Sequence, residues 1–353
     1  MAHFIPGSKE PKRPEIEPNL TRWLEALPLP DLPGRIEQWV RSLPAPRNRL
    51  HAPSPMREAD HLILDGFRQA GWDAELQPFT FDDVNGYADY GTFGPSPYTH
   101  LEGMNIVATK EGSKSREAVV VLGHHDTVRD SPGANDNTAS VAVILELARV
   151  IAPYQFAKSI ILAATDMEEL GFFGSRALVA SLGRAKPVKC AINFETMGYT
   201  SQEPNSQFLP PGLGIIYSSQ VKKIQARGYR GDFTIVIYNG TASGCAAYFA
   251  AGLARLAGAA APILLRDPND LPVTGALLGR TVPFVRQFAR SDHVPFWEAG
   301  IPAIQITDSA NFRYTHYHRQ SDTAEKLDYM RLAHIAGATA FTLASQAGLI
   351  LPD

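Results

Sequence analysis

The sequence predicts an α/β fold in three layers, with a mostly parallel (mixed) twisted sheet and helices on both of its faces. Two observations predict it. Between residues 118 and 195, apolar runs that suit buried strands alternate with segments of helical periodicity, in the order β-α-β-α-β. Polar clusters directly follow these apolar runs, as is typical where parallel strands end at a ligand-binding edge.

The first part of the chain divides into an arm and the start of a domain. Residues 1–35 are rich in proline and charge and close on "LPLPDLPG", so we expect an extended N-terminal arm with little core of its own. Residues 36–353 are expected to form one domain. Within it, "MREADHLILDGFRQAGW" (56–72) has apolar positions at helical spacing, and the "AELQPFTF" that follows indicates a strand.

The central alternation decides the fold class. The predicted strands are the runs "AVVVLG" (118–123), "SIILAAT" (159–165) and "CAINFE" (190–195). Each is continuously apolar, as expected of strands that are covered on both faces. Residues 140–152 place Ile144, Leu147, Ala148 and Ile151 on one helical stripe, and a second helix is expected from Ser175.

The second half of the chain is less regular. Residues from about 200 to 290 combine the loop-like "SQEPNSQFLPPGLG" with the helical "CAAYFAAGLARLAG", and we expect them to contribute the walls of a cleft. A further strand, "IPAIQIT", and a terminal helix with an apolar side complete the layers. The apolar positions of that helix are Leu332, Ile335, Ala336, Ala340 and Leu343.

Composition excludes several classes of partner. The chain has 353 residues, 44% of them hydrophobic, and a formal net charge of -3, which indicates a globular protein. It contains no long basic run and no apolar stretch of membrane-spanning length, so neither a nucleic-acid nor a membrane partner is expected. The N-terminus has no apolar core of a secretory signal, so we expect a cytoplasmic protein. Cys190 and Cys245 match no disulfide framework or zinc spacing and are expected to be buried, reduced thiols.

Polar residues gather where the predicted strands end. In "GHHDTV", strand alternation puts His124 and Asp126 on one side, where Asp126 can hold the ring of His124; alternatively His124 is an ordinary histidine near a strand end. In "PGANDNTAS", Asp136 either caps a helix or is carried back over the strand ends by the turn at Gly133.

Two adjacent carboxylates are the strongest signal. Glu168 and Glu169 directly follow a strand that must be buried, and a divalent cation would offset the cost of holding like charges there. Glu195 ends another apolar strand, and His316 and His318 compete as further ligands. Carboxylates and two imidazoles from different strand ends form a donor set that suits zinc.

Taken together, the motifs resemble the zinc-dependent aminopeptidase and glutamate-carboxypeptidase family of co-catalytic di-zinc metallopeptidases, to which glutaminyl cyclases are related. The resemblance covers the chain from about residue 36 to the end. It is carried by an ordered series: HxD, a GAxDN turn, EELGxxGS, an acidic strand end, SDHxPF and YHxxxDT. It implies the phosphorylase/hydrolase-like zinc exopeptidase fold, with residues 36–353 as a single catalytic domain.

The resemblance also implies the site. Two zinc ions are expected per chain, held by five ligands: His124, Asp136 as the bridge, Glu169, Glu195 and His318. Glu168 is expected to be the general base and Asp126 to orient His124. Three tentative substrate contacts are Tyr317, which can polarise the substrate carbonyl, and the pair Asp292 and His293, which either contact a ligand or cap a buried helix.

The implied activity is hydrolysis of a peptide bond or an amino-acid amide through a metal-bridging hydroxide, by an exopeptidase of the aminopeptidase type. Glu195 departs from the aspartate that is usual in the aminopeptidase branch, so carboxypeptidase and deacylase activities stay as alternatives. A glutaminyl cyclase-type acyltransferase with a single zinc is another alternative. The last is a non-catalytic binding protein on the same scaffold, which the complete ligand set disfavours.

Overall fold

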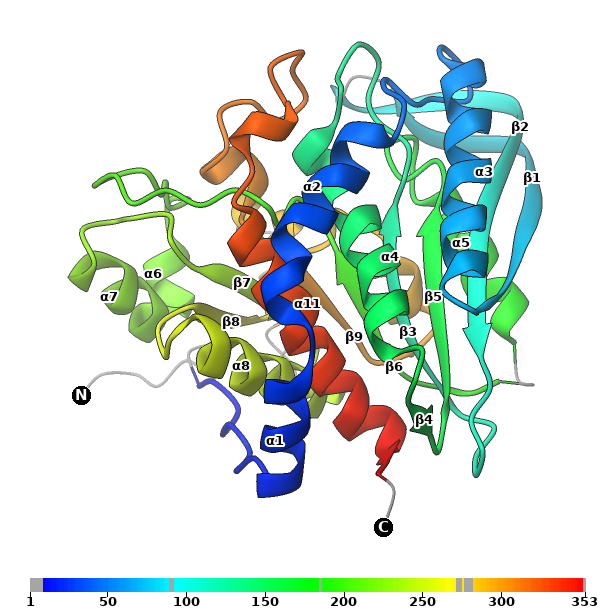
Figure 1. Cartoon of the computed structure of the whole chain (residues 1–353). Helices are drawn as coiled ribbons and strands as arrows, with labels where there is room; N and C mark the ends of the chain where they lie inside the picture. The colour runs from blue at the N-terminus through cyan, green and yellow to red at the C-terminus, as the bar shows by residue number, and fades with distance from the viewer. Residues whose placement is uncertain (1–8, 89–91, 184–185, 271–274, 276–281, 352–353) are drawn as a thin grey trace.

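The computed structural model describes residues 9–88, 92–183, 186–270, 275 and 282–351. Within these residues, eight strands form one mixed sheet in the order β1-β2-β5-β3-β6-β9-β7-β8, with helices on both faces (Figure 1). The strands are β1 (Asp73–Ala88), β2 (Thr92–Lys110), β3 (Ala118–His124), β5 (Ser159–Thr165), β6 (Val188–Phe194), β7 (Thr234–Tyr238), β8 (Pro262–Arg266) and β9 (Ala303–Thr307). The pairs β5-β3, β3-β6, β6-β9 and β7-β8 are parallel, which confirms the predicted fold class.

One face of the sheet carries the largest core of the protein. Alternate residues such as Val119 and Val121 of β3 and Ile192 of β6 point into it, because side chains alternate between the two faces of a strand. The helices that contribute to this core are α1 (Pro18–Ala26), α2 (Leu32–Ser42), α3 (Pro53–Gln69), α4 (Ala139–Ile151), α8 (Ser243–Ala257) and α11 (Tyr329–Leu343). The predicted helices at 56–72, at 140–152 and at the C-terminus are therefore confirmed.

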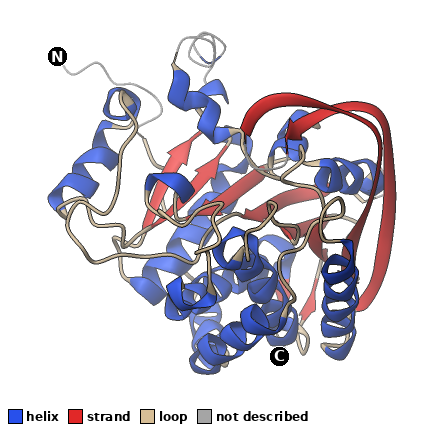
Figure 2. Ribbon diagram, turned by 90° about the horizontal axis from the view of Figure 1, so that it is seen from above, coloured by secondary structure: helices blue, strands red, loops and turns tan. Residues whose placement is uncertain are grey.

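The opposite face is covered in two parts. Over the central strands, α5 (Phe173–Leu182) and α10 (Val294–Glu298) pack on residues such as Val120 and Leu122. Over β7 and β8 lie the short helices α6 (Leu213–Ile216) and α7 (Ser218–Ala226) and the 3-10 turn Pro283–Phe288. The view from above in Figure 2 shows the sheet enclosed between helices. Two short strands, β4 (Gln155–Phe156) and β10 (Leu349–Ile350), pair separately.

The N-terminal segment differs from the expected extended arm. Residues 18–26 form α1, and Trp23, Leu24 and Leu27 are buried in the main core. Pro18 stands in the first turn, where a missing N–H costs nothing, so it starts this helix instead of breaking it. The proline content of residues 1–35 suggested an extended arm, although residues 18–26 have helical spacing of apolar residues. This segment contributes to the core.

Three strands of the eight-stranded sheet were not predicted. β2 continues the chain from β1 into a long antiparallel hairpin, while β7 and β8 are only five residues each and lie in the irregular stretch after residue 200. Cys190 and Cys245 are buried and not joined by a disulfide, as predicted, and the thiol of Cys190 donates a hydrogen bond to Sγ of Cys245 at 3.1 Å. Among the described residues, no helix combines the length and apolarity needed to cross a bilayer.

Candidate metal centre

The Glu168-Glu169 pair lies in a tight turn directly after β5. Met167 has φ of +54°, in the left-handed region, which turns the chain sharply after Asp166. The carboxylate of Asp126 then accepts the backbone N–H groups of Glu168 and Glu169, at 3.2 and 3.3 Å. The Asp126 Oδ1 atom is also 3.3 Å from Nδ1 of His124. Asp126 therefore links the imidazole at the end of β3 to the turn that carries both glutamates.

The turn that carries Asp136 depends on Gly133. Its φ is +62°, and a Cβ atom there would lie 2.4 Å from the carbonyl oxygen of Asp136. From the far end of the chain, the carboxylate of Asp322 accepts the N–H groups of Asn135 (2.9 Å) and Asp136 (3.1 Å). Tyr314 donates its hydroxyl to the same carboxylate at 2.7 Å. These bonds bring the Asp136 side chain over the end of the sheet.

Of the two candidate histidines near the C-terminus, only one lies at the carboxylate cluster. His318 has φ of +57°, and its Nε2 atom lies 3.1 Å from Oδ2 of Asp136 and 3.4 Å from Oε2 of Glu169. His316 instead pairs with the hydroxyl of Ser321 at 2.8 Å. His318 is therefore the histidine at the carboxylate cluster.

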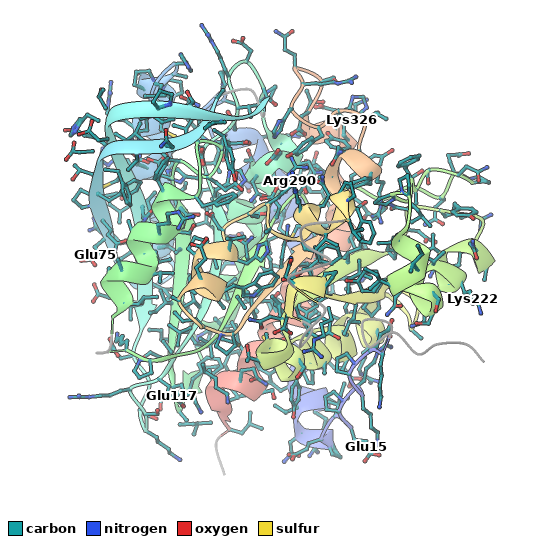
Figure 3. The ribbon with its side chains drawn as sticks, turned by 180° about the vertical axis from the view of Figure 1, so that it is seen from behind. Glu15, Glu75, Glu117, Lys222, Arg290 and Lys326 are labelled. Atoms are coloured by element: carbon teal, nitrogen blue, oxygen red, sulfur yellow. The ribbon has the colours of Figure 1, made fainter. Side chains whose placement is uncertain are left out.

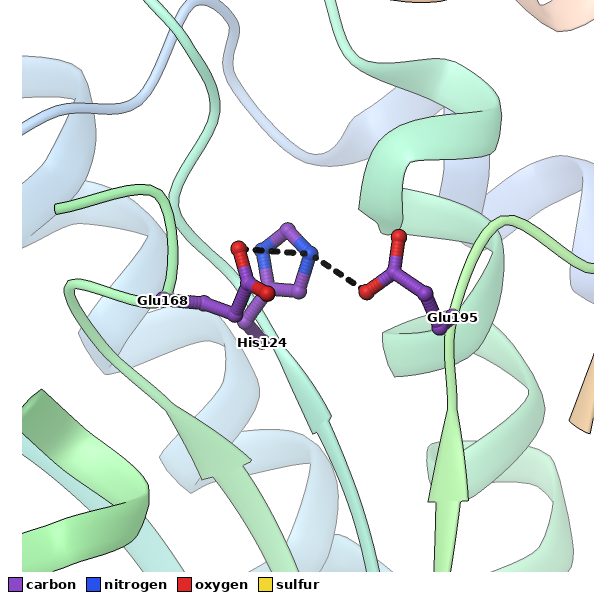
Figure 4. A group of neighbouring side chains, drawn as sticks. All are labelled: His124, Glu168 and Glu195. Atoms are coloured by element: carbon purple, nitrogen blue, oxygen red, sulfur yellow. Dashed lines mark ion pairs between the residues drawn. The ribbon is translucent and has the colours of Figure 1, made fainter. Parts of the chain in front are cut away.

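A second imidazole meets the other side of the cluster. The Nε2 atom of His124 lies 3.3 Å from Oδ1 of Asp136, 3.3 Å from Oε2 of Glu195 and 3.9 Å from Oε2 of Glu168. Figure 4 shows His124 between the two glutamates. Ligand atoms of His124, Glu168 and Glu195 lie within 4.8 Å of one another, and so do those of His124, Asp136 and Glu169.

The distances between the side chains of the cluster fit ligands around a bound metal ion better than hydrogen bonds between those side chains. In the part of the chain that the structure describes, the buried atoms without a hydrogen-bond partner include Nε2 of both His124 and His318, both carboxylate oxygens of Asp136, and Oε1 of Glu169. Ligands about 2.0–2.1 Å from one tetrahedral ion lie about 3.3 Å apart, which is the spacing seen around both imidazoles. Orphaned polar atoms at this spacing are what a cation would satisfy.

The electrostatics also call for positive charge. Burial raises the pKa of Glu168 and Glu169 well above the ordinary value, and neighbouring carboxylates raise it further. Burial would lower the pKa of His124, but the surrounding carboxylates outweigh it and raise that pKa well above its usual range. Several carboxylates in one buried site repel each other, and a divalent cation relieves that repulsion.

The tentative substrate contacts divide into two groups. The ring of Tyr317 stacks on that of His318, with centroids 3.8 Å apart, and Tyr317 lines a cavity beside the cluster. Asp292 is fully buried and accepts the hydroxyls of Thr165 and Ser175, the latter at 2.5 Å. The buried ring of His293 pairs with the carbonyl of Phe288 at 2.8 Å. Neither Asp292 nor His293 is among the described residues that line the cavity, and their contact with a substrate stays a prediction.

A buried network that the sequence did not reveal supports the centre. The guanidinium of Arg47 is fully buried and donates to the carbonyl of His125 (2.6 Å), the carbonyl of Pro44 (2.7 Å) and the hydroxyl of Thr138 (2.6 Å). It thus joins the end of β3 to the residues after the Asp136 turn. Burial lowers the pKa of Arg47 to about 10, so the group stays charged at neutral pH.

A second chain of charges supports the opposite side of the centre. His125 pairs with Asp60 at 2.9 Å, and Asp60 receives two bonds of 2.8 Å from Arg49. Arg49 also donates to Asp166 at 2.5 Å, directly before the glutamate turn. No local motif marks Arg47, Arg49 or Asp60; only their place in the fold does.

An apolar cavity of about 110 Å³ opens beside the cluster, on the same side of the sheet as α5 and α10. Ile235 and Ile237 of β7 and Ile263 and Leu265 of β8 form its floor. Segments 207–224 and 284–290 supply most of the remaining wall, including Arg290, which is labelled in Figure 3. Glu195 belongs to both the cavity lining and the metal-ligand cluster, so the cavity and the cluster adjoin there.

Comparisons with known proteins identify relatives of this chain. Residues 105–232 and 274–343 match the sequence model of one protein family, peptidase family M28. The chain is 30% identical over 332 residues to the uncharacterized protein YfbL of Escherichia coli K12, covering 89% of each chain. It is 29% identical over 276 residues to a probable zinc metalloprotease of Leptosphaeria maculans, covering 68% of this chain and 56% of that protein.

A solved structure shows the same fold. The zinc aminopeptidase BSAP of Bacillus subtilis superposes with a TM-score of 0.63 at 16% identity, covering 92% of this chain and 99% of that one. At this identity the likeness concerns the fold alone. The family model, however, matches more than half of the sequence and spans the segments that carry His124, Asp136, Glu168, Glu169, Glu195 and His318. The family that the motifs predicted is therefore confirmed: the chain belongs to peptidase family M28.

Proposed function

We propose that this peptidase is a di-zinc aminopeptidase that removes the amino-terminal residue from peptides or amino-acid amides. Membership of a peptidase family makes it a hydrolase of peptide bonds. The observation that carries the finer assignment is the position of Asp136: one carboxylate oxygen lies 3.3 Å from His124 and the other 3.1 Å from His318. A carboxylate that faces two imidazoles with different oxygens is suited to bridge two ions.

The donor set divides into two three-residue sites around this bridge. His124, Asp136 and Glu195 would hold one zinc, and Asp136, Glu169 and His318 the other. Imidazole and carboxylate donors suit zinc, and the hard cations calcium and magnesium rarely take histidine. Two divalent ions bring a charge of +4 against -3 from the three carboxylates, which balances much of the buried negative charge.

Glu168 is the group placed to move protons. Zinc, when bound, lowers the pKa of a coordinated water to about 7 and polarises the substrate carbonyl. The Glu168 carboxylate would accept the proton of the attacking water and deliver it to the nitrogen of the leaving group as the C–N bond breaks. The bonds from the Glu168 and Glu169 backbone to Asp126 hold this carboxylate toward the cluster.

The cavity favours a substrate that is bound by its amino-terminal side chain. Glu195 and Tyr317 both line the cavity, so a side chain inserted there would leave the scissile carbonyl near His318 and the ammonium near the carboxylates. Tyr317 would polarise that carbonyl. The relative of Leptosphaeria maculans is itself named as a probable zinc metalloprotease, which supports the choice of metal.

A combined metal and substrate analysis tests the proposal. The purified protein is expected to contain about two zinc ions per chain and to cleave leucine amide and leucine-initiated peptides. N-acetylated versions of the same peptides should resist it. One zinc with formation of pyroglutamate from glutaminyl peptides would instead indicate a cyclase, and cleavage of blocked peptides from the carboxyl end would indicate a carboxypeptidase.

A further inference from the structure

The hairpin of β1 and β2 extends beyond the rest of the sheet. β2 pairs with β5 only over residues 106–110, whereas it pairs with β1 as far as Tyr87 and Pro95. Figure 1 shows the two strands bending together after they leave the sheet. We call residues 82–87 and 95–104 the hairpin extension. A two-stranded hairpin alone is only marginally stable in water, so this part of the chain depends on a further contact.

The hairpin extension contacts the chain directly after the two glutamates. The N–H group of Tyr87 donates to the carbonyl oxygen of Leu170 at 2.8 Å. The Tyr87 ring also meets the ring of Phe172 edge to face, with centroids 5.7 Å apart. Met167 and Leu170, which flank the glutamate pair, share one buried apolar cluster with Leu101 of the extension. The extension therefore holds this turn through a backbone hydrogen bond and through apolar contacts.

Gly86 makes this close approach possible. A Cβ atom at position 86 would lie 2.0 Å from the carbonyl oxygen of Leu170 and 2.9 Å from the ring of Phe173. The first of these atoms belongs to the backbone, so no change of rotamer can relieve the clash. Any larger residue at position 86 must therefore displace either the hairpin extension or the turn that follows β5.

The contacted segment is bonded to the backbone of Glu168. The carbonyl oxygen of Glu168 accepts the N–H groups of Gly171 at 2.9 Å and of Phe172 at 3.1 Å. From the other side, the Asp126 carboxylate accepts the N–H groups of Glu168 and Glu169. The turn is thus held on two sides, and a shift of the segment that the extension contacts would move both glutamates.

We propose that the hairpin extension positions the glutamate turn for the reaction, and that Gly86 is the positioning residue that allows this contact. The proposal rests on the proposed function, in which Glu168 is the general base and Glu169 a zinc ligand. Gly86 acts only through the backbone of the turn. Such an effect can be large, because a misplacement of about 1 Å can lower a catalytic rate about 100-fold.

Gly86→Ala tests the proposal in the zinc-loaded protein. We expect kcat to fall about 10–100-fold. KM should stay nearly unchanged, since no residue of the hairpin extension is among the described residues that line the cavity. Zinc affinity, measured by competition with a chelator, should weaken about 10–100-fold. Gly244→Ala is the matched control, because a Cβ atom at that position meets no atom within 4 Å, and it should change neither quantity.

Hydrogen exchange followed by mass spectrometry tests the same contact without turnover. In Gly86→Ala with excess zinc, the peptide covering residues 166–173 should exchange faster than in the wild type. The peptide from α11 should exchange at the wild-type rate, which would exclude a general loss of stability. Tyr87→Ala removes the ring contact with Phe172 but keeps the backbone N–H group, so it serves if Gly86→Ala does not fold. Its zinc affinity should weaken about 2–10-fold.

The outcomes separate this proposal from the aminopeptidase function. Wild-type exchange over residues 166–173, or wild-type zinc affinity, in folded Gly86→Ala would overturn the positioning role. The same two results in Tyr87→Ala would overturn it where Gly86→Ala does not fold. If the wild type binds zinc but cleaves no peptide, while the variant exchanges faster and binds zinc more weakly, the aminopeptidase function fails and the positioning of the metal site stands.

Discussion

The metal-ligand cluster and the apolar cavity adjoin at Glu195, yet they are built in opposite ways. The cluster consists of side chains at the ends of β3, β5 and β6 and on the turns of Asp136 and His318. Hydrogen bonds that Asp126 and Asp322 accept and that the buried Arg47 donates fix the backbone around it. The cavity is formed mainly by apolar side chains, which lie on β7, β8 and the irregular segments that cover them and meet through contacts without fixed direction.

This difference separates the two tasks of the site. A carboxylate cluster works only in one geometry, because each donor must reach its ion within a few tenths of an ångström. An apolar wall keeps its function while its shape changes, since hydrophobic contact is not directional. Changes in the cluster should therefore act on all substrates alike, and changes in the cavity should act on some substrates and spare others.

The largest expected effect is at Glu168. Glu168→Gln keeps the size of the side chain but removes the proton acceptor, so kcat should fall by about 10²–10⁴-fold for every substrate. Zinc content, measured by mass spectrometry of metals, should stay at the wild-type level. Glu203→Gln, an exposed glutamate, is the matched control. Activity within a factor of two or so of wild type in Glu168→Gln would remove Glu168 as the general base.

A smaller effect is expected at Asp322, which supports the cluster from outside the proposed ligand set. Asp322→Ala removes the acceptor of the Asn135 and Asp136 N–H groups, so the Asp136 carboxylate, which we propose as the bridge, loses its fixed position. Zinc affinity, measured by competition with a chelator, should weaken about 10–100-fold. Asp65→Ala, at an exposed carboxylate of α3, should leave affinity unchanged. Unaltered zinc affinity in a folded Asp322→Ala protein would show that the turn of Asp136 keeps its conformation without the hydrogen bonds to Asp322.

The sequence revealed the centre of the fold because local pattern was sufficient there. The strands at 118–123, 159–165 and 190–195 are continuous apolar runs covered on both faces, and polar residues follow each of them. Residues at such strand ends must converge at one edge. His124, Glu168, Glu169 and Glu195 were therefore predictable as neighbours from the order of the residues alone, although their roles remain proposals.

What the sequence could not show depends on distant contacts. Asp322 supports a turn 186 residues earlier in the chain, and Arg47 reaches Thr138 across 91 residues. Parity along a strand could not choose between His316 and His318, because residues two apart lie on the same face of a strand. The structure has a left-handed backbone at His318, which no strand pattern predicts. β7 and β8, five residues each, are too short for their pattern to stand out between loops.

The smallest expected effect is in the cavity and depends on the substrate. Ile237→Phe adds bulk to the cavity floor and should lower kcat/KM about tenfold for substrates with large amino-terminal side chains, with alanine substrates nearly unaffected. Ile237→Val should act in the opposite direction and favour the larger side chains. Zinc content should be equal in all three proteins, because Ile237 is outside the proposed ligand set. An equal loss of kcat/KM for alanine and leucine substrates in Ile237→Phe would contradict this prediction. It would mean that the substitution in the cavity also distorts the cluster, because a distorted cluster lowers kcat/KM for every substrate.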